Sequence, residues 1–246
     1  MSDSTFAVFS DIHSNLEALQ AVLADIAEQG IHRMMCLGDV VGYAANPSKC
    51  LNQVRDLGCP VLRGNHDAAA AWNYALVHMR DVAKRGIEFS RLKLSASQRA
   101  YLAELPLVFT DGVHEFVHAS LYAPSDWRYI QNGVEALMHL TEQRCRLSFC
   151  GHTHVPGMWH LSGTGNLKQW RGYGRLPLAP GGKTLINVGS VGQPRDGSPA
   201  ACYVICDPEA DCIEFRRVDY DIAKTRRKIM RAKLPAFVGE RLSRGE

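Results

Sequence analysis

Polar residues of the kinds that bind metals stand at the ends of five expected strands, and this recurrence is the strongest constraint on the fold. The segments are Asp11-Ile-His13, Gly38-Asp39, Gly64-Asn-His-Asp67, His118 and Gly151-His-Thr-His154. Each adjoins a short apolar run of the kind found in buried strands. Any single segment is as consistent with a turn or a helix cap as with a site. Together they predict that the carboxyl ends of neighbouring strands meet at one edge of a sheet.

The first half of the chain alternates between strand-like and helix-like patterns. Apolar residues recur at helical spacing after each early strand, and Gly30 and Gly58 stand where such helices end. This alternation predicts α/β layers. We expect strands at 6–10, 34–37 and 60–62, and helices at 16–30, 46–58, 68–90 and 95–105.

The second half is richer in strands. Only one clear helix is expected there, at 133–145, which favours a second and largely antiparallel sheet. The glycine-rich segment 162–182 is interpreted as a surface excursion, and the basic segment 220–246 as a helical tail with a solvated face. The expected strands lie at 116–119, 147–150, 184–188, 201–206 and 212–218.

Charge and hydropathy exclude several classes of protein. The formal net charge of +3 over 246 residues is too small for a dedicated nucleic-acid binder. The longest apolar runs fall well short of the roughly 20 residues that a membrane span needs, so no membrane partner is expected. The first residues show no secretion signal, which predicts a cytoplasmic location and reduced cysteines.

The clustered side chains predict a metal centre. Converging carboxylates repel one another unless a cation lies between them. Imidazole, carboxylate and amide groups together suit divalent manganese, iron, nickel, zinc or cobalt. Seven candidate ligands are more than one ion needs, and they favour two ions that share a carboxylate.

The five segments resemble, in order and spacing, those of the calcineurin-like metallophosphoesterase superfamily. The resemblance runs from Phe6 to about Val218. Within it, the segment from Asn187 to Asp196 is similar to the matching segment in small bacterial and archaeal phosphoesterases of this superfamily. It implies a four-layer α/β sandwich of two mixed β-sheets flanked by α-helices, in a single domain over residues 1–246. The matching blocks are Ser10 to His13, Leu37 to Gly42, Arg63 to Asp67, Val117 to Ser120 and Cys150 to His154.

The resemblance also assigns roles to residues. It implies two divalent metal ions, with manganese expected and iron, nickel, zinc, cobalt or magnesium as alternatives. His66 would be the catalytic acid, and Asp67 would orient its ring. The implied ligands are Asp11, His13 and His154 for the first ion, Asn65, His118 and His152 for the second, and Asp39 as the bridge between them.

The implied reaction is hydrolysis of a phosphodiester, a phosphomonoester or a dinucleoside polyphosphate. A hydroxide between the metals would attack phosphorus, and His66 would protonate the leaving oxygen. For the small-molecule substrate, Arg195 is a candidate to meet a phosphate, against a surface ion pair, and Tyr43 to stack on a base, against simple packing.

Two other functions stay open. A nuclease could use the same site, although the small net charge disfavours a nucleic-acid partner. A non-catalytic scaffold could share the fold, but such a protein would not need all seven ligands together with His66. The sequence leaves open whether the chain forms a homo-oligomer.

Overall fold

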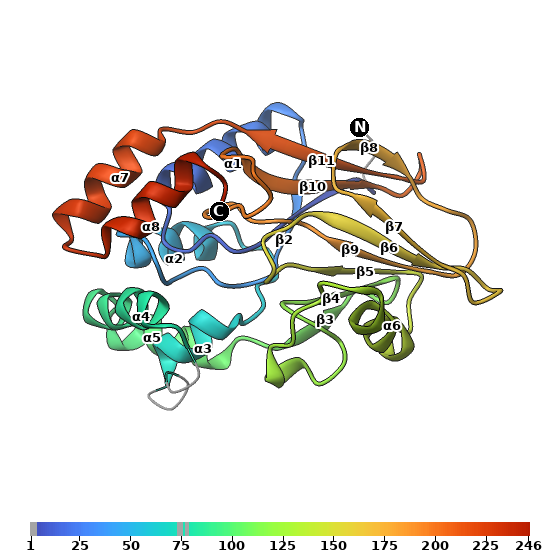
Figure 1. Cartoon of the computed structure of the whole chain (residues 1–246), viewed down its shortest axis with the longest axis horizontal. Coiled ribbons are helices and arrows are strands. Elements are labelled where there is room, and N and C mark those ends of the chain that lie inside the picture. The colour runs from blue at the N-terminus through green and yellow to red at the C-terminus, as the bar shows by residue number, and fades with distance from the viewer. Residues whose placement is uncertain (1–3, 73–75, 77–78) are drawn as a thin grey trace.

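The structure is a computed structural model that describes residues 4–72, 76 and 79–246. Its strands form two mixed sheets (Figure 1). The first sheet has the order β2 (Arg33–Cys36), β1 (Phe6–Phe9), β10 (Ala201–Asp207), β11 (Cys212–Val218) and β8 (Gly174–Pro177). The second has the order β3 (Val108–Thr110), β4 (His114–Val117), β5 (Leu147–Cys150), β9 (Lys183–Asn187), β6 (Gly157–Leu161) and β7 (Leu167–Arg171).

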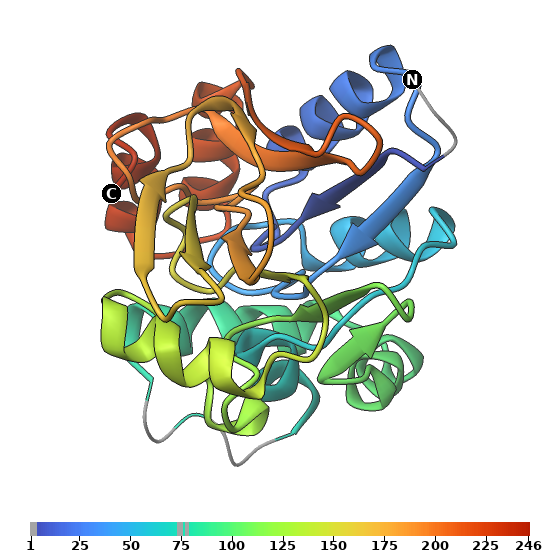
Figure 2. The ribbon, with the colours of Figure 1, turned by 90° about the vertical axis from the view of Figure 1, so that its right-hand side faces the viewer.

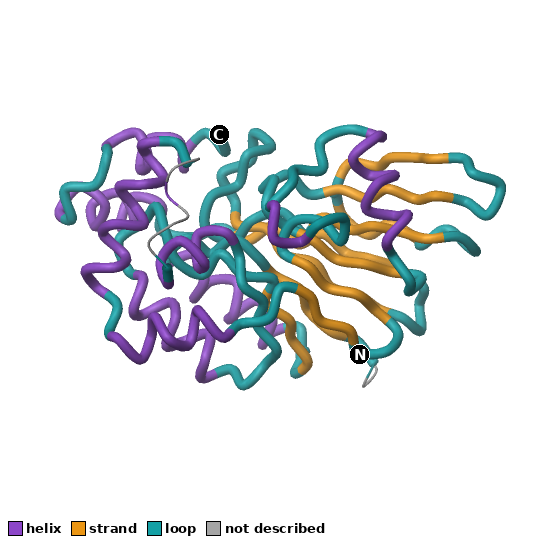
Figure 3. Tube along the Cα trace, turned by 90° about the horizontal axis from the view of Figure 1, so that it is seen from below, coloured by secondary structure: helices purple, strands orange, loops and turns teal. Residues whose placement is uncertain are grey.

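Helices flank the sheets. In Figure 2, α1 (blue) lies above the sheets and α6 (yellow-green) lies below them. Figure 3 shows most helices gathered at one end of the molecule and the strands at the other. The helices are α1 (Leu16–Glu28), α2 (Pro47–Asp56), α3 (Asn65–Ala71), α4 (Asp81–Lys93), α5 (Ala96–Glu104), α6 (Gly133–Glu142), α7 (Ile222–Arg231) and α8 (Ala236–Glu240).

Side chains that alternate between the two faces of a strand form the apolar cores between the layers of the sandwich. In β1, Phe6 and Val8 point into the apolar core between the two sheets, where Phe149 of β5 also lies. The intervening Ala7 and Phe9 point to the opposite face, against a core that includes residues of α1 and α2. Side chains of successive residues in a strand alternate between the two faces, so a short apolar strand supplies both cores. The predicted sandwich of two mixed sheets with outer helices is confirmed.

Several sequence expectations were wrong in detail. The expected strand at 60–62 is a single bridge between Val61 and Cys36, because the amide of Arg63 already bonds to Pro106 and α3 begins at Asn65. The expected helix at 68–90 is two helices, α3 and α4, and residues 73–75 and 77–78 of that stretch lie outside the described residues. The second sheet is antiparallel in three of its five strand pairings, as expected, but it is parallel at its centre, between β4, β5 and β9. The strands β10 and β11 belong to the first sheet with β1.

The segment 162–182 and the C-terminal tail are integrated into the fold. The first contains β7, which pairs with β6, and β8, which pairs with β11, so it connects the edges of both sheets. In the tail, Arg226, Arg227, Arg231 and Lys233 are exposed as expected. The opposite side of the tail is buried, however, and α7 packs against α1 (Figure 1). In the described part of the chain, no helix is long and apolar enough to cross a bilayer.

Candidate metal centre

The strand ends bring the predicted ligands together. Asp11 and His13 follow β1, Asp39 follows β2, His118 follows β4, and His152 and His154 follow β5. The strands β1 and β2 are parallel, as are β4 and β5, so the carboxyl ends of each pair lie at the same edge. All six side chains are buried.

The backbone at these positions is strained. Five candidate ligands adopt the left-handed conformation that non-glycine residues avoid, and each such residue costs of order 1–3 kcal/mol. Strain of this kind persists only where the surrounding structure fixes it, and it is concentrated at functional sites. The five residues, with their φ angles, are Asp11 (56°), His13 (48°), Asp39 (52°), His152 (64°) and His154 (62°).

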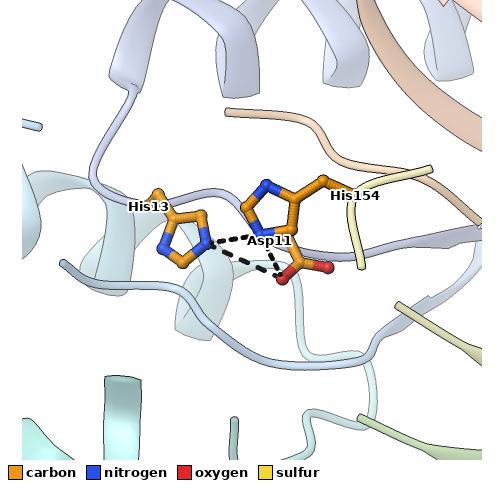
Figure 4. Close-up of side chains that lie close together, drawn as sticks. All are labelled: Asp11, His13 and His154. Atoms are coloured by element: carbon orange, nitrogen blue, oxygen red, sulfur yellow. Dashed lines mark hydrogen bonds and ion pairs between the residues drawn. The ribbon is translucent and has the colours of Figure 1, made fainter. Parts of the chain in front are cut away.

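The first cluster consists of Asp11, His13 and His154, and its three ligand atoms cannot all be paired with one another by hydrogen bonds. The Nε2 atoms of His13 and His154 lie 3.1 Å apart, and Oδ1 of Asp11 lies 3.7 Å and 3.2 Å from them (Figure 4). Nδ1 of His13 and of His154 each lie within hydrogen-bond distance of a backbone carbonyl, of Val41 (3.2 Å) and Gln193 (2.6 Å). If Nδ1 carries the proton in both rings, two bare Nε2 lone pairs face one point. That arrangement suits a cation.

The second cluster consists of Asp39, His118 and His152, and its histidine rings are also held by backbone carbonyls. Nε2 of His118 lies 3.5 Å from Oδ2 of Asp39, and its Nδ1 is 3.0 Å from the carbonyl of Leu37. His152 is turned the other way, with Nε2 placed 2.8 Å from the carbonyl of Trp127. Ligand atoms of Asp39, His118 and His152 lie within 4.8 Å of one another. The carbonyls therefore fix the orientation of the rings, as the outer partners of metal-binding histidines do.

Asp39 stands between the two clusters. Its Oδ2 is 3.6 Å from Nε2 of His13 in the first cluster and 3.5 Å from Nε2 of His118 in the second. Its Oδ1 accepts a hydrogen bond from the backbone amide of His66 (2.8 Å). A side chain at Gly64 would place Cβ 2.1 Å from that Oδ1, so glycine is required there. The carboxylate is thus held with one oxygen free toward both clusters.

The pKa shifts favour the metal-binding forms of His13, His152 and Asp39, whereas His118 is held protonated. Burial lowers the pKa of His152 to about 3 and lowers the pKa of His13 well below its usual range, which favours the neutral imidazole that ligates metals. Burial would raise the pKa of Asp39, but His118 and His66 hold it well below its ordinary value. Burial would also lower the pKa of His118, yet Asp39 raises it to about 9. Metal binding must therefore displace a proton from this pair.

His66 lies over the first cluster, but Asp67 does not orient it. The His66 ring is 4.7 Å from the ring of His13, and burial lowers its pKa to about 4. Its Nδ1 is buried with no hydrogen-bond partner. Asp67 instead accepts hydrogen bonds from the amides of Val41 (3.2 Å) and Gly64 (3.1 Å), and no bond from Asp67 to the ring occurs among the described residues. Asp67 is the third residue of α3, where a carboxylate reaches back to the helix cap, so it positions two loops.

Both residues predicted to bind substrate lie next to this cluster. The Tyr43 ring is 4.8 Å from the ring of His13 and 4.7 Å from that of His66. Nη2 of Arg195 is 3.5 Å from the Tyr43 hydroxyl and 2.8 Å from Oε1 of Gln193. The surface ion pair considered for Arg195 is not among the ion pairs of the described residues.

Comparison with known proteins decides the family. The sequence pattern of the calcineurin-like phosphoesterase superfamily domain matches residues 5–211. The chain belongs to the calcineurin-like phosphoesterase superfamily. An uncharacterized protein of Methanocaldococcus jannaschii is 40% identical over 250 residues, which is 100% of each chain.

Two solved structures share the fold of this chain. The crystal structure of a metallophosphoesterase from Sphaerobacter thermophilus is 34% identical with a TM-score of 0.86, and the match covers 98% of this chain and 99% of that one. A hypothetical protein from Pyrococcus horikoshii shares the fold at 21% identity, with a TM-score of 0.81 and 98% coverage of both chains. The resemblance inferred from the sequence is therefore confirmed.

Three residues that support this candidate site were not predicted from the sequence. The carbonyls of Gln193 and Trp127 fix the rings of His154 and His152, and the ring of Tyr129 stacks on His152 at 4.1 Å. Trp127 and Tyr129 belong to an irregular loop before α6, where no periodic pattern points inward. Gln193 lies in the segment Asn187–Asp196, whose similarity to small phosphoesterases was the one sequence feature that pointed to it.

Proposed function

We propose that this superfamily member hydrolyses small phosphate esters or anhydrides with the help of two divalent cations. The observation that carries the proposal is the position of Asp39, whose Oδ2 faces His13 at 3.6 Å and His118 at 3.5 Å. A single carboxylate oxygen between two sets of ligands is what a shared ligand requires.

The donor set fits such cations. Oδ1 of Asp11, Oδ1 of Asn65 and Nε2 of His118 are buried and have no hydrogen-bond partner, which is costly unless a ligand satisfies them. We assign Asp11, His13 and His154 to one cation, Asn65, His118 and His152 to the other, and Asp39 to both. Cations held there would stabilise negative charge on the phosphoryl oxygens and lower the pKa of water. The mixed nitrogen and oxygen ligands suit several divalent ions, of which we propose manganese.

His66 is proposed as the proton donor to the leaving oxygen. Its ring lies beside His13 and Tyr43, and its Nδ1 has no protein partner, so the ring is free to meet a substrate. The protein alone disfavours the charged ring, and an anionic phosphate at this position would favour it. His66 would then carry its proton only when substrate is bound.

The remaining residues would hold the substrate. Arg195 offers a guanidinium beside Tyr43, suited to a phosphate oxygen. A cavity of about 270 Å³, lined by residues that include Tyr122 and Tyr129, opens on the side of His152. Its aromatic walls suit a flat organic group such as a nucleobase. We therefore favour small nucleotidic phosphoesters over large polymers.

The test combines metal content with a panel of substrates. Protein loaded with manganese and freed of excess metal should hold two ions per chain by plasma mass spectrometry. It should hydrolyse bis-p-nitrophenyl phosphate, p-nitrophenyl phosphate, a cyclic nucleotide or a dinucleoside tetraphosphate when assayed with manganese, nickel, magnesium or zinc. A protein that binds no metal would instead fit a scaffold, and one that cleaves only single-stranded DNA would be a nuclease. Either result overturns the proposal.

A further inference from the structure

Two arginines meet beside the candidate metal centre without an acidic partner. Arg195 follows β9, and Arg241 begins a 3₁₀ turn, Arg241–Ser243, at the end of the C-terminal tail. Both donate to the same oxygen, Oε1 of Gln193, from Nη2 of Arg195 (2.8 Å) and Nη1 of Arg241 (3.2 Å). The Nε atoms of both are buried with no hydrogen-bond partner. Among the ion pairs of the described residues, neither guanidinium takes part.

This arrangement is unfavourable unless an anion joins it. Two like charges that share one neutral oxygen repel each other, and burial together with Arg195 lowers the pKa of Arg241 to about 10. The acids next to the two arginines do not neutralise them, because Asp196 pairs with Arg217 and Glu240 is exposed and in none of the ion pairs of the described residues. Glu246 is exposed and pairs with Arg244. Guanidinium groups bind phosphate oxygens through pairs of parallel hydrogen bonds, so a phosphate would satisfy the free donors and the charge together.

Packing of the tail holds Arg241 in place. Leu234, Val238 and Leu242 of the tail are buried in a cluster with Ala44, and Tyr43 packs against the same cluster. At the other end of the tail, Lys228 pairs with Glu17 of α1. The tail is therefore fixed against the loop that carries Tyr43, and Arg241 stands at a defined position.

The position of Arg241 suits a group next to the reacting phosphate. The guanidinium of Arg195 lies beside the first cluster, since its Nη2 is 3.5 Å from the hydroxyl of Tyr43, whose ring is 4.8 Å from that of His13. Arg241 has no hydrogen bond to a candidate ligand in the described part of the chain, and it reaches the site through Gln193. Gln193 in turn holds the His154 ring through its carbonyl. Arg241 therefore contacts the candidate metal ligands only through Gln193, whereas Arg195 also contacts Tyr43 beside His13 and His66.

We propose that Arg195 and Arg241 form a subsite for a second phosphate, and that the substrates of this protein carry a phosphate chain. The proposal rests on the proposed phosphoesterase function and narrows its substrate class to compounds such as nucleoside di- and triphosphates or dinucleoside polyphosphates. The C-terminal tail thereby gains a role in selecting the substrate.

The first experiment measures binding without catalysis. Inorganic triphosphate is titrated into metal-free protein by calorimetry, for the wild type, Arg241→Gln and the control Arg244→Gln. Arg244 lies in the same turn region but is exposed and pairs with Glu246. Arg241→Gln should weaken binding by about tenfold, the scale of one lost charge-assisted contact, and Arg244→Gln should not. Equal affinities of the wild type and Arg241→Gln would overturn the proposal.

The second experiment compares substrates with manganese present. Arg241→Gln should raise KM for diadenosine tetraphosphate at least about tenfold more than KM for bis-p-nitrophenyl phosphate, and Arg241→Lys should recover part of the difference. An equal loss on both substrates would mean that Arg241 only supports the fold. Arg241→Gln could also destabilise the fold, which a larger fall in Tm than that of Arg244→Gln would show. In that case Arg195→Gln, which changes the other arginine of the subsite, is used to compare KM for the same two substrates. Wild-type protein that binds triphosphate through Arg241 but hydrolyses nothing would refute the proposed function and leave the subsite standing.

Discussion

The carboxylate of Asp39 and the backbone amide of His66 are joined by a hydrogen bond of 2.8 Å. This bond uses Oδ1 of Asp39 and leaves Oδ2 facing His13 and His118. It also fixes the first turn of α3, from which the His66 ring projects. The shared metal ligand and the proton donor of the proposed mechanism are therefore positioned by one another.

Replacing the shared ligand should empty the site. We expect Asp39→Asn to reduce bound manganese from two ions per chain to at most one. Hydrolysis should fall by more than the roughly 100-fold that losing an outer partner of a ligand costs. Plasma mass spectrometry and steady-state kinetics measure both. Retention of two ions with near-normal kcat would show that Asp39 does not bridge.

Replacing the proton donor should separate metal binding from turnover. His66→Ala should keep both ions and lower kcat by about 10²–10⁴ for a substrate with an alkoxide leaving group. The loss should be smaller with p-nitrophenyl phosphate, because p-nitrophenolate leaves readily without a proton. The exposed His32→Ala is the control. Loss of metal in His66→Ala, or the same loss of kcat on both substrates, would contradict the assignment.

A single methyl group behind Asp11 should disturb the first cluster. A Cβ at Gly151 would lie 2.4 Å from Oδ2 of Asp11 and 2.4 Å from Oγ of Ser10, closer than real atoms approach. Gly151→Ala should therefore displace Asp11 and weaken binding of one metal ion by tenfold or more, on the scale of disturbing an outer partner. Gly163→Ala, whose Cβ would meet nothing within 4 Å, is the matched control. Equal metal affinity in the two variants would count against the packing argument.

Stability should depend on pH through Asp25, far from the metal centre. Burial would raise the pKa of Asp25, but hydrogen bonds from Arg216 (2.8 Å and 3.1 Å) and Tyr203 (2.6 Å) lower it below its ordinary value. A lowered pKa in the folded state stabilises the fold above the unfolded pKa of about 3.9, and this contribution is lost as pH falls through the folded value.

The free energy of unfolding of the wild type should therefore exceed that of Asp25→Asn by a constant amount above about pH 5. The gap should shrink as pH falls below about 4. Urea denaturation at a series of pH values measures it. A gap that stays constant down to pH 3 would show that the ionised carboxylate is not the source of the stabilisation.

The sequence predicted that these side chains come together, because strand ends fix the positions of side chains locally. Asp11, Asp39 and His118 each adjoin a buried strand, and parallel pairing then places them together. The role of Asp67 was missed because an acid next to a histidine suggests a direct contact, whereas the helix cap offered it closer donors. Local reasoning alone does not distinguish these two partners.

Long-range pairing explains the other differences. In β8, Gly174 pairs with Phe215 of β11, and β8 shows no alternation that would mark it as a strand. The position of Arg241 likewise depends on the tail packing against the Tyr43 loop. A basic run with a solvated face and a basic run that reaches a site have the same composition, so only tertiary contacts separate them.

Anomalous diffraction from crystals grown with manganese tests the central claim most directly. The account predicts two peaks about 3.5–4 Å apart, both within bonding distance of Oδ2 of Asp39, one on the side of Asp11 and the other on the side of His118. A single peak, or two peaks of which one has no contact with Asp39, would contradict it.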